Sequence, residues 1–178
     1  MVFKNIAISG DIGTGKTTLA KNLAKKLGWE HINAGDYFRK WHLENNIPLE
    51  MSEKVPEKID RAFDEDFKRK MKNSKNTVFE SRLAGWLAKD FNDTFKILVV
   101  ADFDKAMERV SGRDGISFDE ARANALERSN SHKKKFKNLY GAVDYLNPNY
   151  FNLVVDTTSI TPDQVVEEVL TAISFKAI

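Results

Sequence analysis

Gly10-Asp11-Ile12-Gly13-Thr14-Gly15-Lys16-Thr17 is the most informative stretch of this chain. It has the form G-x-x-x-x-G-K-T, in which glycines let backbone N–H groups turn inward around an anion. The segment Phe3–Ser9 before it alternates and then becomes apolar, which is typical of a buried strand. After it, Leu19, Leu23 and Leu27 lie four residues apart, as on the buried face of a helix. Strand, glycine loop and helix together form the context that a phosphate-binding loop requires.

This loop also supplies side chains for nucleotide chemistry. We expect Lys16 to reach the β- and γ-phosphates of a bound nucleotide, and the Thr17 hydroxyl to bind Mg²⁺. The backbone N–H groups of residues 10–17 and the helix N-terminus would hold the phosphates, and Thr18 is counted with the same set. The alternative is a glycine-rich turn that binds nothing, which the flanking strand and helix make the weaker interpretation.

Length and composition narrow the class of protein. The 178 residues suffice for one domain with a full core, and 42% hydrophobic and 30% charged residues are ordinary for a globular protein. We expect no signal peptide and no membrane span, since no apolar run approaches roughly 20 residues. The lack of cysteine excludes disulfides and thiolate catalysis. A net charge of +2 argues against a dedicated nucleic-acid binder. We expect a cytoplasmic protein with small-molecule partners.

Strand and helix signals alternate along the chain, which predicts an α/β fold with a parallel sheet covered by helices on both faces. The five expected strands lie at about Val2–Ser9, Trp29–Asn33, Thr77–Glu80, Phe95–Ala101 and Leu153–Val155. The expected helices lie at about Lys16–Leu27, Asp36–Asn45, Pro56–Lys72, Asp104–Ser111, Ser117–Tyr140 and from Thr161 onward.

Two polar helical segments, about 36–73 and about 110–140, are longer than a crossover between strands needs. We therefore expect residues 1–178 to form a single P-loop domain with two insertions that fold over bound substrates. Such closure suits phosphoryl transfer, because water competes with the acceptor. Within the first insertion, Asp60 and Arg61 are the polar candidates for reading a base.

Two arginines are candidates for binding a second phosphate. Arg39 opens the helix after the second strand, and Arg82 follows the buried strand that ends at Glu80, at the edge where open α/β sheets bind ligands. The alternatives are a surface position for Arg39 and an ion pair between Glu80 and Arg82. Asp36 either faces the phosphate loop or caps the helix that it begins. The residue by itself favours the role of helix cap.

Two acidic residues compete for the metal. Glu80 and Asp102 each end a buried strand, and either would hold a magnesium-bound water. We prefer Glu80, because Arg82, two residues later in the same loop, is also a candidate for binding a phosphate. The histidines His31, His42 and His132 show no metal-binding spacing and are interpreted as structural or solvated.

Further arginines fall in or near the second insertion: Arg109, Arg113, Arg122 and Arg128. Arginines in a mobile flap neutralise charge on a transferring phosphoryl group, and the alternative is a solvated basic face. We interpret Lys133–Lys135 as such a solvated face, although Arg128, His132 and Lys135 would share one side of a continuous helix.

Three segments resemble a known family. They are Gly10–Thr18, Ala-Gly-Asp-Tyr-Phe-Arg at 34–39 and Glu-Ser-Arg-Leu-Ala-Gly-Trp at 80–86. Together they resemble the nucleoside monophosphate kinases, most of all the archaeal type of cytidylate kinase. Segments 139–144 and 152–157 extend the resemblance over nearly the whole chain. Lys134-Lys135 stands where the family usually has a lysine-arginine pair, and Asn152 replaces a usual aspartate.

This resemblance implies a set of roles. Residues 10–17 would hold the phosphates of ATP, and Arg39 and Arg82 the phosphate of the acceptor nucleotide. Arg109 would lie by the ATP base or phosphates, while the other three arginines close on the transferring group, namely Arg113, Arg122 and Arg128. The implied reaction is ATP + (d)CMP ⇌ ADP + (d)CDP with Mg²⁺, carried out by a monomer.

Three functions stay open, in decreasing order of preference. The first is a nucleoside monophosphate kinase acting on CMP or dCMP, which needs no general base because the acceptor phosphate is already ionised. The second is a P-loop kinase for AMP or another small metabolite. The third is a nucleotide-dependent switch or motor, for which the sequence lacks Asn-Lys-x-Asp and Leu-Ser-Gly-Gly-Gln.

Overall fold

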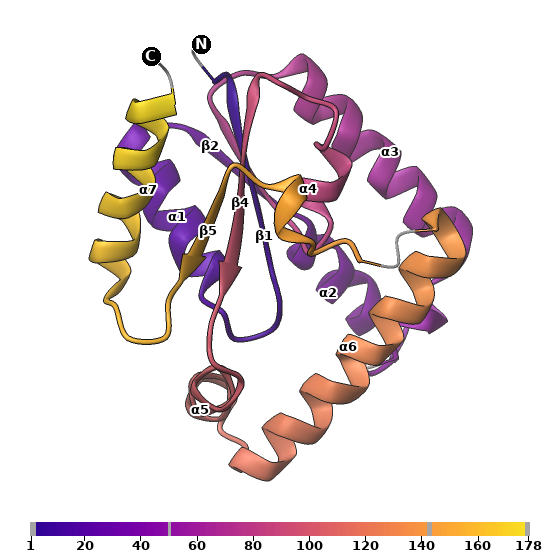
Figure 1. The fold of residues 1–178 in the computed structure, drawn as a ribbon. Coiled ribbons are helices and arrows are strands. Elements are labelled where there is room, and N and C mark those ends of the chain that lie inside the picture. The colour runs from indigo at the N-terminus through magenta and orange to yellow at the C-terminus, as the bar shows by residue number, and fades with distance from the viewer. Residues whose placement is uncertain (1–2, 50, 142–143, 177–178) are drawn as a thin grey trace.

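The computed structural model describes residues 3–49, 51–141 and 144–176 (Figure 1). Its centre is a five-stranded parallel sheet in the spatial order β2-β3-β1-β4-β5. The strands are β1 (Asn5–Gly10), β2 (Glu30–Asn33), β3 (Thr77–Glu80), β4 (Thr94–Val100) and β5 (Leu153–Asp156). The predicted sheet is thereby confirmed. The expected start of the first strand at Val2 lies outside the described residues, as do Ala142 and Val143 of the segment 139–144.

Seven helices and two 3₁₀ turns are found in the described part of the chain. They are α1 (Lys16–Leu27), α2 (Ala34–Glu44), η1 (Ser52–Lys54), α3 (Glu57–Asn73), α4 (Ala84–Leu87), α5 (Phe103–Asp114), α6 (Phe118–Tyr140), η2 (Pro148–Tyr150) and α7 (Pro162–Lys176). Gly28 closes α1 at φ 68°, and the Ser117 side chain caps α6 by accepting the Glu120 N–H. Helix α4 and the turns η1 and η2 were not predicted from the sequence, because such short elements carry no periodic signal.

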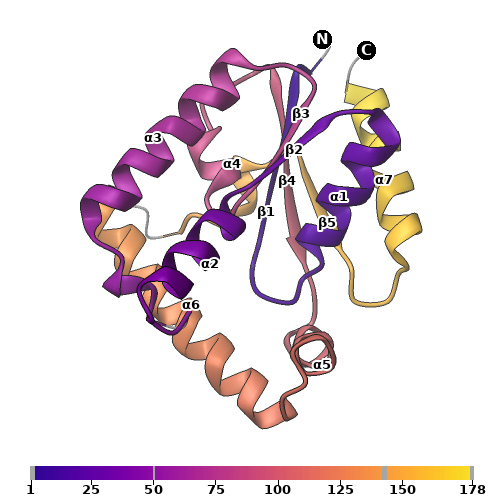
Figure 2. The same ribbon diagram turned by 180° about the vertical axis from the view of Figure 1, so that it is seen from behind.

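Side chains of the central strand β1 point alternately to the two faces of the sheet, so each face has its own part of the core. Ile6 and Ile8 pack with side chains of α1 and α7 on one face. Ala7 and Phe79 face the other side and pack with α3 and α4. Figures 1 and 2 show α1 and α7 together on one side and α3 and α4 on the other. The sheet is therefore covered on both faces, as a parallel sheet requires.

The two segments predicted as insertions contact each other. Residues 36–73 form most of α2, then η1 and α3, and the second segment forms the end of α5 and α6 (Figure 2). The hydroxyls of Ser52 in η1 and Ser131 in α6 lie 2.6 Å apart. Helix α6 also packs on α5 through Ala106, Val110 and Ala121. The second segment therefore bridges the sheet edge and the first segment, and its role as a lid stays a prediction.

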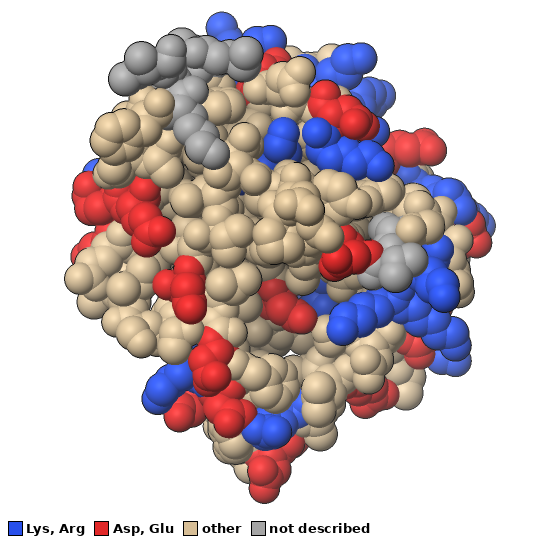
Figure 3. Space-filling view, in the orientation of Figure 1, with Lys and Arg blue, Asp and Glu red and all other residues tan. Residues whose placement is uncertain are grey.

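The surface is charged and mixed in sign. On the face shown in Figure 3, Lys and Arg gather over the side formed by the carboxyl-terminal half of α6, where Lys133, Lys134 and Lys137 are exposed. Among the described helices, none combines the length and the apolar character that crossing a membrane demands.

Candidate active site

One cavity of about 900 Å³ brings together the glycine loop, the end of β3 and both predicted insertions. The loop follows β1, which lies between β3 and β4, so it opens at the middle of the carboxyl edge of the sheet (Figure 1). Helix α6 reaches this edge through Ser129, which donates to the Asp11 carboxylate of the loop. The residues that line the cavity therefore come from segments far apart in the chain.

Backbone geometry explains the glycines of the loop. Gly13 and Gly15 adopt φ values of 76° and 86°, the left-handed region that other residues disfavour. A Cβ on Gly10 would lie 2.5 Å from the carbonyl oxygen of Val99, and one on Gly13 would lie 2.5 Å from that of Ala106. Since glycine at the N-cap leaves the first N–H groups of α1 without a side-chain partner, they are available to an anion.

The remaining loop residues divide between structural and cavity-facing positions. Ile12, Lys16, Thr17 and Thr18 line the cavity. The Thr14 side chain is buried and donates to the carbonyl oxygen of Asp11 at 3.0 Å, which stabilises the loop itself.

Lys16 carries the charge of the loop into the cavity. Its Nζ lies 3.4 Å from the carbonyl oxygen of Asp11. Burial, followed by the nearby Arg82 guanidinium, lowers the pKa of Lys16 to about 8, although Glu80 opposes this shift. An incoming phosphate would restore the full charge of Lys16, because an opposite charge favours the ionised form.

Asp11 ties the loop to two other elements. Its carboxylate pairs with Arg82 at 3.1 Å and accepts a hydrogen bond from Ser129 of α6 at 3.0 Å. Burial alone would raise the pKa of Asp11, but Arg82 and these hydrogen bonds outweigh burial and lower it. Arg82 therefore pairs with Asp11, whereas the alternative Glu80–Arg82 ion pair does not occur among the described residues.

Glu80 faces the start of α1. Its Oε1 accepts the Thr17 hydroxyl at 2.5 Å, and its Oε2 lies 2.9 Å from Nε2 of His31. Asp102, the competing residue, instead caps α5 by accepting the Lys105 N–H at 3.0 Å, and it does not line the cavity. Hydroxyl and carboxylate oxygens suit Mg²⁺, which binds few protein ligands and keeps waters and phosphate oxygens. Thr17 and Glu80 thus fit the predicted metal.

Most of the predicted arginines reach the cavity. Arg39, Arg82, Arg109, Arg113 and Arg128 line it. Arg109 also donates to the hydroxyl and the carbonyl oxygen of Thr157, at 3.0 and 2.6 Å. Arg113 forms a two-point ion pair with Asp114.

Arg122 is not brought to the cavity. Its guanidinium pairs with Asp104 and lies over the rings of Phe103 and Phe118. Since Arg122 is held by these partners and does not line the cavity, it would reach a bound phosphate only if its side chain or these helices moved.

Asp36 neither caps α2 nor faces the glycine loop. Asn33 is the capping residue, and its Oδ1 accepts the Gly35 N–H at 2.8 Å. Asp36 lies in the first turn of α2 and pairs with Arg39 at 2.5 Å, on an exposed surface. The expected cap was wrong by three residues, because an asparagine at the end of β2 already meets the requirement.

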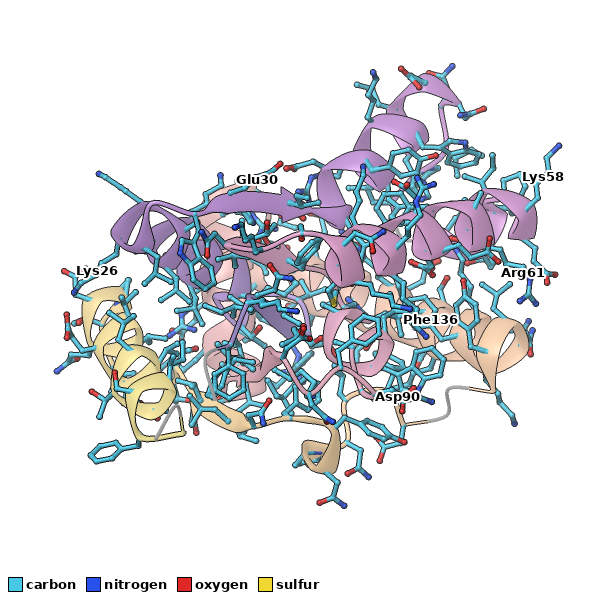
Figure 4. All side chains as sticks on the ribbon, turned by 90° about the horizontal axis from the view of Figure 1, so that it is seen from above. Lys26, Glu30, Lys58, Arg61, Asp90 and Phe136 are labelled. Carbon is cyan, nitrogen blue, oxygen red and sulfur yellow. The ribbon has the colours of Figure 1, made fainter. Side chains whose placement is uncertain are left out.

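The end of the cavity away from the loop holds buried charges. Asp60 pairs with Lys135 at 2.7 Å, and both side chains are almost fully buried. Asp64 accepts the Tyr140 hydroxyl at 2.7 Å, and burial raises the pKa of Asp64 to about 6. Arg61 does not join them, because it pairs with Glu57 and lies over the Tyr140 ring at the periphery of the molecule (Figure 4).

Sequence reasoning missed three residues that contact this site. His31 contacts Glu80, Lys135 is buried against Asp60, and His132 lies in the cavity wall. Burial, followed by Arg82, holds the pKa of His132 well below its usual value. The shared helical side of Arg128, His132 and Lys135 was the available signal, whereas nothing local to His31 indicated its partner.

A glycine loop at the centre of a parallel sheet, facing a second set of arginines across one cavity, defines a P-loop kinase. The family model described as an AAA domain matches residues 6–135. A gluconokinase from Sinorhizobium meliloti has a similar fold, with a TM-score of 0.66 at 15% identity, covering 99% of this chain and 95% of that one.

Two curated relatives show to which family of P-loop kinases the chain belongs. The cytidylate kinase of Pyrococcus abyssi is 39% identical over 173 residues, which cover 94% of this chain and 92% of that protein. The cytidylate kinase of Sulfolobus acidocaldarius is 34% identical and covers 96% and 94%. The chain belongs to the cytidylate kinase family.

Proposed function

We propose that this protein transfers the γ-phosphoryl group of ATP to CMP or dCMP, with Mg²⁺, as a monomer in the cytoplasm. The observation that carries the proposal is one cavity lined by Lys16 of the glycine loop, by Asp60 of α3 and by the arginines Arg39, Arg82, Arg109, Arg113 and Arg128. Two nucleotides bound end to end would bring their phosphates together at these arginines.

In this proposal the protein aligns the two nucleotides and neutralises the charge of their phosphates, and it takes little part in covalent chemistry. The backbone of residues 10–17 and Lys16 hold the ATP phosphates. Arg39 and Arg82 orient the acceptor phosphate, so that its already ionised oxygen attacks the γ-phosphorus in line. Arg109 lies beside the bound ATP, Arg113 and Arg128 neutralise charge on the transferring group, and Arg122 would join them only if α5 and α6 move.

Thr17 and Glu80 hold the metal in this proposal. Bound Mg²⁺ supplies neutralisation of charge on the β- and γ-phosphates. Glu80 supplies a carboxylate oxygen, and His31 holds the other oxygen in place. Helix α6 excludes water by contacting both the loop, through Ser129, and η1, through Ser131.

A coupled assay of ADP formation with CMP, dCMP, UMP, AMP and GMP as acceptors tests the proposal. We expect CMP or dCMP to give the highest kcat/KM, and Lys16→Ala to lower kcat by at least about 100-fold. Lys21→Ala is the matched control, because Lys21 is an exposed lysine of the same helix. Slow ATP hydrolysis that no monophosphate stimulates would refute the proposed function.

A further inference from the structure

The buried pair of Asp60 and Lys135 links two helices at the acceptor end of the cavity. Asp60 comes from α3 and Lys135 from α6, and their side chains are 4% and 9% exposed. Both residues line the cavity. Nζ of Lys135 contacts Oδ1 of Asp60 and also donates to the carbonyl oxygen of Ser52 at 2.7 Å. The pair is therefore held in place from three elements.

One oxygen of this pair has no partner. Oδ2 of Asp60 is buried and accepts no hydrogen bond from any described residue. A buried carboxylate oxygen left without a donor is costly, and such an atom in a cavity wall indicates a donor from a ligand. Arg61, the neighbouring candidate, does not supply this donor because it pairs with Glu57 outside the cavity.

The surroundings of the pair suit a flat ring. Phe38, Val55 and Phe136 also line this cavity. Nζ of Lys135 lies 5.6 Å from the centre of the Phe38 ring, and Phe136 lies in the interior of the molecule (Figure 4). Apolar side chains beside a few convergent polar groups are the usual composition of a site for a small aromatic ligand.

We propose that Asp60 and Lys135 together read the edge of the acceptor base, with Oδ2 of Asp60 accepting the exocyclic amino group of cytosine. The Lys135 ammonium then donates to the adjacent ring nitrogen or carbonyl oxygen. This inference rests on the proposed function and names the specificity-determining residues of the same site. Uracil carries an oxygen where cytosine carries the amino group, so it places an acceptor against Asp60, and its N3–H places a donor against the Lys135 ammonium. Because Arg39 and Arg82 fix the phosphate in this arrangement, uracil does not shift to another register.

The test removes the amino group from the substrate and the charge from the protein. Three acceptors are compared by kcat/KM and by calorimetric binding: CMP, UMP and the 4-deamino analogue of CMP, pyrimidin-2-one riboside 5′-phosphate. We expect the wild type to prefer CMP over the analogue by about 100-fold, and Asp60→Asn to reduce this preference to within about threefold. Asp66→Asn is the matched control, an acidic residue of the same helix that pairs outside the cavity, and it leaves the preference unchanged.

The outcomes separate the possible failures. A merely structural role of Asp60 would lower activity with all three acceptors equally and leave their ratios intact, which would overturn the inference. Equal use of CMP and the analogue by the wild type would overturn it without any variant. Because removing one partner leaves a buried charge, Asp60→Asn/Lys135→Met is the second variant, and it is expected to lose the preference as well. A wild type inactive with every monophosphate would instead refute the proposed function.

Discussion

Raising the pH from about 7 to about 9 is expected to weaken ATP binding about tenfold, because Lys16 loses its proton in the free protein over this range. The pKa of Lys16 is lowered to about 8 by burial and by Arg82. The free protein therefore carries a protonated Lys16 in about nine molecules of ten at about pH 7, and in about one of ten at about pH 9.

The direction of this pH dependence follows from the protonation state of Lys16 that binds ATP. The phosphates of ATP favour the ammonium form of Lys16, so the pKa rises in the complex and binding takes up a proton. Below about pH 7 the proton on Lys16 is already present, so this residue no longer changes the affinity. Above about pH 8 each further pH unit costs up to tenfold in affinity, about 1.4 kcal/mol, until the pKa of the complex is reached.

Isothermal titration calorimetry without acceptor measures this effect directly. Titrations in buffers of different ionisation enthalpy should show uptake of about half a proton at about pH 8, and almost none at about pH 6.5. Lys16→Arg is the control, because a guanidinium stays protonated throughout, so its binding should take up no proton. Equal proton uptake by both proteins, or constant wild-type affinity up to about pH 9, would show that Lys16 does not hold the phosphates.

Three further predictions follow from the site. Asp64→Asn should raise the free energy of unfolding, measured in urea, by about 1–3 kcal/mol at about pH 8. The pKa of Asp64 is about 6 in the folded protein and lower in the unfolded chain, so ionising this carboxylate costs stability in full only above about pH 6. A stabilisation that does not shrink as the pH falls below about 6 would contradict this reasoning. His31→Gln should raise the Mg²⁺ concentration for half-maximal rate about tenfold, since His31 holds Glu80; an unchanged Mg²⁺ titration argues against that role. Arg82→Lys should raise the KM for CMP by about 10- to 100-fold in the coupled assay, while Arg69→Lys on the exposed side of α3 should not; equal KM values for both variants would exclude a phosphate contact at Arg82.

Much of the fold was predictable because its signals are local. The glycine loop is recognised from residues within one short segment, and the Gly28 and Ser117 caps each depend on contacts within a few residues. The strands were predictable from short apolar runs, and the parallel sheet from their alternation with helices. The cap of α2 was misplaced for the same reason, since Asn33 and Asp36 are both suitable capping residues and only the end of β2 decides between them.

The partners of charged side chains were much less predictable. Arg122 and Arg128 lie on the same helix and look alike in sequence, yet only Arg128 lines the cavity. Lys135 belongs to a run of lysines that the sequence suggests to be exposed to solvent. In the structure, α6 lies against α3 and buries Lys135 beside Asp60. A side chain's position in its own helix indicates which neighbours share its face, and says nothing about which element packs there.

The sequence by itself determined the phosphate-binding loop, the class of fold and the family, because these follow from residue spacing within single elements and from segments read along the chain. Only the tertiary structure decided that Thr17 meets Glu80 across 63 positions, that Ser129 meets Asp11 across 118, and that Asp60 meets Lys135. These pairs depend on the crossing of helices over the carboxyl edge of the sheet. That crossing is set by the summed burial of many apolar side chains, and no short motif records it.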